Sequence, residues 1–154
     1  MFNLALFQPE IPPNTGNIIR LCANSGATLH LIKPLGFALD DARLKRAGLD
    51  YHEFANIKVH EDFTSFKTTV EKKRIFACST KGKFCYADAK FEVGDTFLFG
   101  PETRGLPKTI LDEFPPNKIL RIPMLPHSRS INLSNAAAII LYEALRQNNF
   151  RLTS

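Results

Sequence analysis

The stretch TFLFGPETRGLP, residues 96–107, combines residue types that could build a ligand site. A run typical of a buried strand ends at Gly100, and Glu102 and Arg104 follow in the same loop. Glycine lets a ligand approach the backbone closely, and prolines stiffen a loop and remove hydrogen-bond donors. The alternative is a surface turn with an exposed Glu102–Arg104 ion pair, but such a turn needs neither a second glycine nor a second proline. The composition therefore favours a rigid loop around a ligand.

A second polar set lies in PPNTGNIIRLCANSG, where Asn14 or Thr15 can cap a helix after the two prolines. On that helix Asn17, Arg20 and Asn24 fall in one row, opposite an apolar face. Asparagine is a poor helix former, and a purely solvated face would usually carry Glu and Lys. A guanidinium between two amides suits the orientation of a phosphate or a hydroxyl. A solvated face stays the alternative.

A third polar set lies in IPMLPHSRSINLSNAAA, residues 122–138. Hydrogen-bonding side chains stand between the apolar strand end and the next helix: Ser128, Arg129, Ser130, Asn132, Ser134 and Asn135. One of them is expected to cap that helix, but a single cap does not need so many. Backbone N–H groups at the start of the helix could also face an electron-rich group.

The elements that must position these sets alternate between strand and helix along the chain. Strands are predicted at Phe2–Phe7, Thr28–Lys33, Arg74–Ser79, Thr96–Gly100 and Lys118–Ile122, with a weaker candidate around Lys58. Helices are predicted at Gly16–Ser25, Asp41–Ala47, Phe63–Lys72, Lys108–Glu113 and Leu133–Asn148. This alternation predicts a single α/β domain over residues 1–154 with a mostly parallel sheet.

In open α/β sheets, ligands bind beyond the carboxyl ends of the strands. The loop after the first strand has no G-x-G-x-x-G, and the chain has no G-x-x-x-x-G-K-[ST]. Glycine-rich or proline-rich strand exits occur instead in the second half of the chain, as STKGK, GPETRG and IPMLPHSRS. We therefore expect a pocket built by the C-terminal half.

The composition sets further limits on function. With 20 basic and 15 acidic residues the net charge is +5, which permits a polyanionic partner without requiring one. An odd number of cysteines without CxxC spacing predicts a reduced, cytoplasmic chain, and the histidines show no metal-ligand spacing. The apolar runs are too short for a signal peptide or a membrane span. No nucleophile with an adjacent base is present in sequence, so any chemistry would depend on positioning.

The last predicted helix is apolar on every side between Ala136 and Tyr142. Such a helix is buried on more than one face. We expect one side to pack on the sheet and the other on a second subunit, with Tyr142 in that interface. A central buried helix in a monomer is the alternative.

Together the three polar sets resemble the three motifs of the SPOUT superfamily, the knotted S-adenosylmethionine-dependent RNA methyltransferases. NTGNIIR (Asn14 to Arg20) resembles the first motif, FGPETRGLP (Phe99 to Pro107) the second, and IPMLPHSRSINLSNAAA the third. The resemblance runs from Phe2 to about Gln147. It is closest to the short bacterial members that methylate the ribose 2′-hydroxyl of the tRNA wobble nucleotide, which is cytidine or carboxymethylaminomethyluridine at position 34 of certain leucine tRNAs.

This resemblance implies an α/β fold with helices on both faces of the sheet and a deep C-terminal trefoil knot, a rare exception to the rule against threaded chains. It implies a homodimer, tRNA as partner, S-adenosyl-L-methionine as cofactor with S-adenosyl-L-homocysteine as product, and no metal. The residues expected to contact the cofactor are Cys78, Ser79, Thr80, Gly100, Glu102, Ile122, Met124, Ser130, Ile131 and Leu133.

The resemblance also implies residue roles in catalysis. Arg20 would lie nearest the 2′-hydroxyl, and because a guanidinium does not readily give up its proton it would stabilise developing negative charge rather than act as a base. Asn17 would position Arg20, and Ser134 or Asn135 would hold the ribose. Contacts to RNA are expected from Arg20, Arg129 and Asn135, and contacts across the dimer from Tyr142 and Arg104.

Two other functions stay open from the sequence. A 2′-O-methyltransferase acting on another tRNA or rRNA site would share the whole pocket. A non-enzymatic RNA-binding module would need only the basic clusters, which comprise Arg43, Lys45 and Arg46; Lys72, Lys73 and Arg74; Lys81 and Lys83; and Arg129.

Overall fold

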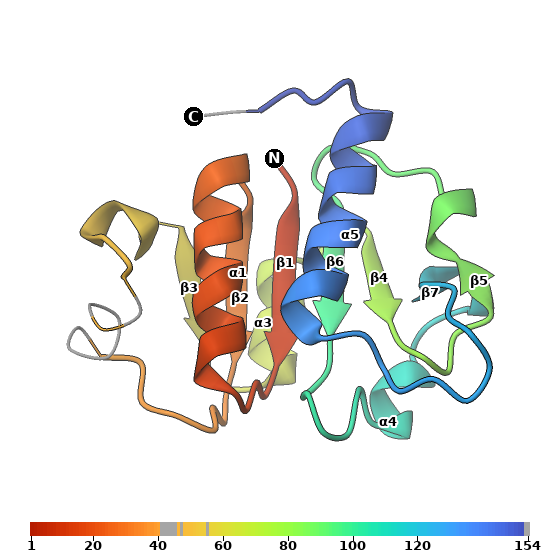
Figure 1. Cartoon of the computed structure of the whole chain (residues 1–154), viewed down its shortest axis with the longest axis horizontal. Coiled ribbons are helices and arrows are strands. Elements are labelled where there is room, and N and C mark those ends of the chain that lie inside the picture. Colours follow the sequence, from red (N-terminus) through yellow and green to blue (C-terminus); the bar gives the residue numbers. More distant parts are fainter. Residues whose placement is uncertain (41–45, 47, 55, 153–154) are drawn as a thin grey trace.

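The computed structural model describes residues 1–40, 46, 48–54 and 56–152. A seven-stranded sheet runs in the order β3-β2-β1-β6-β4-β7-β5, and its strands pair in parallel (Figure 1). The strands are β1 (Asn3–Phe7), β2 (Thr28–Ile32), β3 (Ile57–His60), β4 (Ile75–Cys78), β5 (Phe84–Cys85), β6 (Thr96–Phe99) and β7 (Ile119–Arg121). The helices are α1 (Pro12–Ser25), α3 (Phe63–Thr69), α4 (Lys108–Leu111) and α5 (Leu133–Gln147), with 3₁₀ turns η1 (Tyr51–Phe54), η2 (Tyr86–Asp88) and η3 (Pro116–Lys118).

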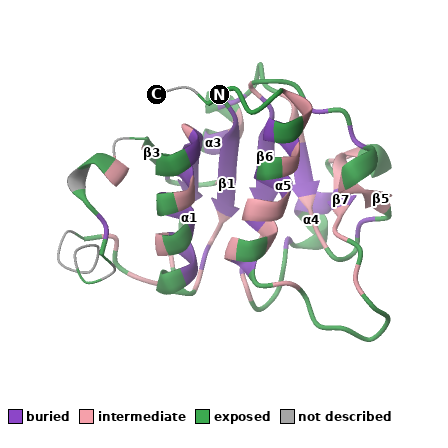
Figure 2. Cartoon of the chain, turned by 45° about the horizontal axis from the view of Figure 1, so that its top comes forward, coloured by how far each residue is buried: buried purple, intermediate pink, exposed green. Residues whose placement is uncertain are grey.

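Helices cover both faces of this sheet, with α1 and α5 side by side on one face and α3 and α4 on the other (Figure 1). Alternate residues of β1 enter different cores: Leu4 and Leu6 pack with α1 and α5, and Ala5 packs with α3 and α4. Because both faces are covered, β2 and β6 are buried along their whole length. Figure 2 shows these central strands as buried, while the outward sides of α1 and α5 stay exposed or half-buried.

Most predicted elements are present, with shifted ends. The prediction that α1 begins at Gly16 with Asn14 or Thr15 as its cap is wrong, because the helix begins at Pro12 and the N-cap is Ile11. Proline suits the first helical turn, where its missing N–H would have no partner and its fixed φ is already helical. The helix predicted at Asp41–Ala47 lies outside the described residues except for Arg46. The weak candidate around Lys58 is β3, and β5 was not predicted.

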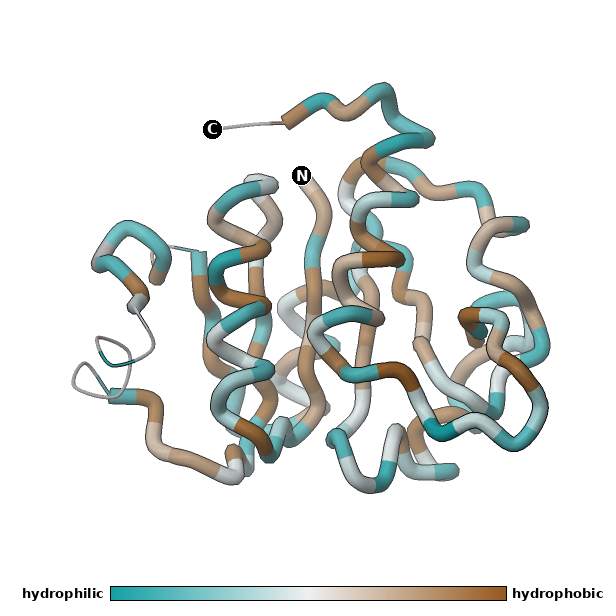
Figure 3. Tube along the Cα trace, in the orientation of Figure 1, coloured by the Kyte–Doolittle hydropathy of each residue, from teal (hydrophilic) through white to brown (hydrophobic). Residues whose placement is uncertain are grey.

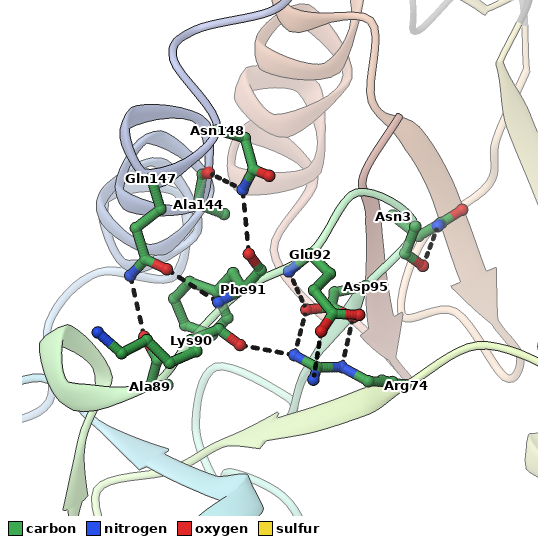
Figure 4. Close-up of polar contacts among 11 residues, drawn as sticks. Asn3, Arg74, Ala89, Lys90, Phe91, Glu92, Asp95, Ala144, Gln147 and Asn148 are labelled. Atoms are coloured by element: carbon green, nitrogen blue, oxygen red, sulfur yellow. Dashed lines mark hydrogen bonds and ion pairs between the residues drawn. The ribbon is translucent and has the colours of Figure 1, made fainter.

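The end of the sheet opposite the strand exits is closed by polar contacts (Figure 4). Two guanidinium nitrogens of Arg74 each donate to the buried carboxylate of Asp95 at 2.8 Å. The side chain of Gln147, at the end of α5, accepts from the N–H of Phe91 and donates to the carbonyl of Ala89. These contacts fix the C-terminal end of α5 to the segment that leads into β6.

None of the helices formed by the described residues has the length and apolarity needed to cross a bilayer.

Candidate functional site

The loop after β6 folds back tightly on itself, and this explains its two glycines. The N–H groups of Arg104 and Gly105 both donate to the carbonyl of Pro101, at 3.3 and 2.8 Å. A Cβ atom on Gly100 would lie 2.2 Å from the backbone nitrogen of Leu106, so only glycine fits there. Gly105 has a φ of +68°, in the left-handed region that favours glycine. The loop is therefore tightly closed, and the rigidity that the sequence predicts for it stays a prediction.

The carboxylate of Glu102 points from this loop to the start of α1. It accepts hydrogen bonds from the backbone N–H groups of Glu10 at 2.8 Å and Ile11 at 2.6 Å, and from Nδ2 of Asn14 at 3.3 Å. The positive end of the helix dipole adds to this attraction. In return, Glu10 Oε1 accepts from the N–H and the hydroxyl of Thr103, and these two bonds lower the pKa of Glu10. Glu102 therefore joins the second motif to the first, in place of the local ion pair with Arg104 that the sequence left open.

The third motif is joined to the same network through two asparagines. Oδ1 of Asn14 accepts from Nδ2 of Asn132 at 3.0 Å. Oδ1 of Asn132 caps α5 by accepting from the backbone N–H groups of Ser134 at 2.9 Å and Asn135 at 3.3 Å, and from the Ser134 hydroxyl at 2.6 Å. Asn132 is thus the cap that the sequence predicted without choosing a residue. The three motifs form one continuous hydrogen-bonded assembly.

Beside this assembly, the ends of β4, β6 and β7 enclose a cavity of about 460 Å³. The exit of β4 is held against β7, because the N–H of Ser79 donates to the carbonyl of Leu120 at 3.0 Å. A Cβ on Gly82 would lie 2.7 Å from the carbonyl oxygen of Ile119, so the loop after β4 packs closely against the start of β7. Every residue expected to contact the cofactor lines this cavity: Cys78, Ser79, Thr80, Gly100, Glu102, Ile122, Met124, Ser130, Ile131 and Leu133.

Arg20 lies outside this cavity and lines a second one of about 370 Å³, together with Asn17, Arg46 and the apolar side chains of Phe37, Ala38, Leu39 and Leu49. Ile11 and Asn14 line the first cavity while Pro12 and Pro13 line the second, so the first turn of α1 separates the two. The hydrogen bonds of Arg20 go to Glu53 and to the carbonyl of Gly48. The sequence expected an amide, Asn17, to position this guanidinium, and the structure places a carboxylate beside it.

The remaining predicted residues lie around the two cavities. Ser134 is half-buried against its cap, Asn132, and Asn135 is exposed one residue further along α5. Arg104 and Arg129 are exposed on the loops after β6 and β7. Tyr142 is 41 % exposed on the outward side of α5, in line with Asn135 and with the half-buried Ala138 and Ile139. Figure 3 shows that hydrophobic residues recur along α5.

The chemistry of the first cavity is that of binding rather than covalent catalysis. Burial raises the pKa of the Cys78 thiol, so this cysteine is not a thiolate nucleophile at neutral pH. Among the described residues no group of three or more His, Cys, Asp or Glu side chains could hold a metal ion. The lining combines apolar side chains, backbone groups and hydroxyls, which is typical of a small-molecule site.

Three residues of this arrangement had no functional role in the sequence-based prediction: Asn14, Asn132 and Glu53. The first two lie inside the quoted motifs, and their amide side chains next to a proline-led helix and a serine-rich loop were a usable signal. Glu53 reaches Arg20 across 33 positions of sequence, and no local pattern marks such a contact.

The fold and the first cavity define a class of protein: an open parallel α/β domain whose ligand cavity lies beyond the carboxyl ends of the strands. Polar loops line this cavity, in place of the G-x-G-x-x-G loop of dinucleotide-binding domains. Residues 1–142 match the model of the SpoU rRNA Methylase family, and the chain belongs to that family. It is therefore a methyltransferase, and the resemblance read from the three motifs is confirmed.

Individual relatives agree with this assignment. The chain is 59 % identical over 150 residues to a tRNA (cytidine(34)-2′-O)-methyltransferase of Methylovorus glucosotrophus, covering 97 % of each chain. A solved structure described as "Structural insights into the 2-OH methylation of C/U34 on tRNA" has a TM-score of 0.89 at 46 % identity, with 98 % of each chain covered. An AdoMet-bound rRNA methyltransferase from Sinorhizobium meliloti has a TM-score of 0.77 at 26 % identity, with 94 % of this chain and 56 % of that chain covered.

Proposed function

We propose that this protein methylates the ribose 2′-hydroxyl of the wobble nucleotide, position 34 of tRNA, with S-adenosylmethionine as methyl donor. The observation that carries the proposal is the first cavity, which is lined by all the residues that the motif resemblance assigned to the cofactor. The chain matches relatives that are tRNA (cytidine(34)-2′-O)-methyltransferases, over nearly their full length, and these matches support the choice of substrate.

The residues of the first cavity fit this cofactor. Its volume of about 460 Å³ falls within the usual range for small-molecule sites. Apolar side chains such as Ile122 and Leu133 can cover an adenosine, and hydroxyls and backbone groups around Ser79 and Thr80 can hydrogen-bond its polar edges. The missing side chain of Gly100 lets the backbone at Gly105 and Leu106 close against it, and this closed loop forms part of the cavity wall. The bound cofactor would supply a methyl group on a sulfonium centre, which is the electrophile of the reaction.

The polar residues of α1 and α5 would act on the ribose. Arg20 would bind the neighbouring phosphate and stabilise negative charge as the 2′-oxygen loses its proton. Asn17 lines the same cavity as Arg20 and would orient the phosphate, and Ser134 or Asn135 would hold the ribose at the start of α5. Alignment of the hydroxyl with the methyl group would then provide most of the rate enhancement.

We further propose that the working form is a homodimer, located in the cytoplasm, in which Tyr142 and Arg104 contribute to the interface. The outward stripe of α5 offers an apolar surface, and α1 lies directly beside it (Figure 1). In one chain Arg20 lies on the far side of the first turn of α1 from the cofactor cavity. A second copy could bring its own Arg20 to that cavity.

The test of the function is ribose-methylation mapping of tRNA treated with the purified protein and S-adenosylmethionine. We expect a new 2′-O-methyl group at position 34 with the wild-type protein and a strongly reduced level with Arg20→Ala, while calorimetry shows cofactor binding by both. Methylation at another ribose would favour a different RNA substrate. Absence of cofactor binding would leave only a non-enzymatic RNA-binding role.

The homodimer is tested by mixing two defective chains, assayed at a cofactor concentration too low to fill the weakened cavity of Gly100→Ala. Co-expression of Arg20→Ala with Gly100→Ala gives heterodimers with one intact site if each site takes Arg20 from the partner, which restores about a quarter of the wild-type activity. If each chain uses its own Arg20, every site in the heterodimer carries one defect and the activity stays near zero.

A further inference from the structure

One edge of the Arg20 guanidinium is occupied by segment 48–54. Nε donates to Oε2 of Glu53 at 3.2 Å, and Nη2 donates to the carbonyl of Gly48 and lies 3.5 Å from Oε1 of Glu53. A guanidinium is a planar fork with five N–H donors. These contacts use the Nε and Nη2 side of the fork, and no described residue contacts Nη1, whose two N–H groups can therefore serve another acceptor.

Glu53 is itself held in place. Its Oε1 accepts from the backbone N–H of Asp50 at 3.2 Å, and its side chain is 16 % exposed, against 50 % for Arg20. The hydrogen bond from Arg20, followed by that from Asp50, lowers the pKa of Glu53, so the carboxylate is charged at neutral pH. Gly48 has a φ of +74°, which only glycine adopts readily and which fixes the carbonyl that Arg20 contacts. The segment is therefore a preformed seat for one edge of the guanidinium.

We propose that Glu53 is a positioning residue for the methyl transfer: it fixes Arg20 so that the Nη1 edge is presented to the RNA. This inference rests on the proposed function, because it assigns Arg20 to the ribose and its phosphate. A carboxylate at this place has two opposed effects. It orders the guanidinium, which favours the transition state, and it reduces the local positive charge, which weakens the binding of phosphate in the ground state.

These opposed effects predict a separation of kcat from KM. In Glu53→Ala the guanidinium becomes free to rotate, so kcat falls about 30-fold, the factor that corresponds to reordering a free arginine side chain. The KM for tRNA stays within about threefold of wild type or decreases, because an anion next to the phosphate site has been removed. Glu53→Gln keeps an oxygen acceptor for Nε–H and should recover most of kcat. A merely structural role would raise KM and lower kcat together.

The control variant is Glu113→Ala, which removes a carboxylate that is 45 % exposed, pairs with Lys67 at 2.8 Å and lies far from Arg20 in the fold, near α4. It should change neither kcat nor KM. The double variant Arg20→Ala/Glu53→Ala should be no slower than Arg20→Ala alone, because Glu53 acts only through Arg20. Additive losses in the double variant, or a Glu53→Ala enzyme with wild-type kcat, would overturn the proposal.

A spectroscopic measurement separates this inference from the proposed function. The Nε–Hε signal of Arg20, assigned by its loss in Arg20→Lys, should be resolved and slow to exchange in the wild type and should be lost or fast to exchange in Glu53→Ala. If the wild-type protein fails to methylate position 34, the proposed function is wrong whatever this signal shows. If the signal is the same in both proteins, Glu53 does not hold Arg20 and the inference is wrong whatever the substrate.

Discussion

Replacement of Gly100 by alanine tests the central geometric claim, that the loop after β6 is closed so tightly that its backbone shapes the cofactor cavity. The added Cβ would lie 2.2 Å from the nitrogen of Leu106 and 2.3 Å from the carbonyl carbon of Gly105. Both are backbone atoms, so no side-chain rotation relieves the contact. The loop must move by roughly 1 Å, because carbon atoms in optimal contact are separated by about 3.5 Å or more.

The cost of that movement can be worked out from packing. Forcing an extra methyl group into a closed space typically costs about 1–3 kcal/mol. We expect Gly100→Ala to lose about 2–3 kcal/mol of unfolding free energy, the upper part of this range, because the contacted atoms are in the backbone. Since the displaced loop lines the cofactor cavity, the affinity for S-adenosylmethionine should fall by about 10–100-fold.

The assays are urea unfolding for stability and isothermal calorimetry for cofactor affinity. Gly94→Ala is the matched control. Gly94 has a positive φ, +101°, but no atom lies within 4 Å of the added Cβ, and Gly94 does not line the cavity. It should lose about 1–2 kcal/mol of stability through backbone strain and keep its cofactor affinity. A Gly100→Ala protein with wild-type stability and wild-type affinity would refute the account of the loop.

Three further predictions concern polar groups. His30 is buried between His60 and Asn3, at 2.9 and 3.2 Å, and burial followed by the His60 charge lowers its pKa to about 3. The stability that comes from burying neutral His30 is complete above the unfolded pKa of about 6.5 and is lost as the pH falls toward 3. The free energy of unfolding, measured in urea, should therefore be about 2 kcal/mol lower at pH 5 than at pH 7.5, and His30→Gln should reduce this difference. Arg74→Met should lower the free energy of unfolding by about 3 kcal/mol in the same assay, because it leaves the 3 %-exposed Asp95 carboxylate without its ion-pair partner. Lys108→Met removes one partner of an exposed pair and should lower it by less than about 0.5 kcal/mol. Glu102→Gln should destabilise the protein by about 1–2 kcal/mol, measured by thermal unfolding, because a single amide oxygen cannot accept from all three donors at the start of α1; an unchanged melting temperature would show that these bonds add nothing.

The fold and the first cavity were largely predictable from local sequence. The central strands are runs of apolar residues, as expected for strands buried on both faces. Because parallel strands place their carboxyl ends at the same edge of the sheet, the glycine-rich loops that follow neighbouring strands lie close together. The start of α1 was misplaced because Asn14 has the residue type of an N-cap. In the folded chain its amide instead connects Glu102 to Asn132, contacts that span 88 and 118 positions and that no local rule contains. The trefoil knot stays a prediction.

The partners of Arg20 were unpredictable for the same physical reason, and they change how the first motif is understood. The row of Asn17, Arg20 and Asn24 is exposed as the helical spacing required, so periodicity was a sound guide to direction. Periodicity cannot show that a 3₁₀ turn beyond β2 brings a carboxylate against that row. Glu53 holds the Nε and Nη2 side of the half-exposed Arg20 guanidinium, so a ligand can use the fixed guanidinium only by approaching its Nη1 side. Because the turn of α1 that separates the two cavities is itself fixed by Glu102, movement within one chain would have to break those hydrogen bonds to bring Arg20 to the cofactor cavity. These fixed contacts support the proposal that the two halves of the site are contributed by two copies of the chain.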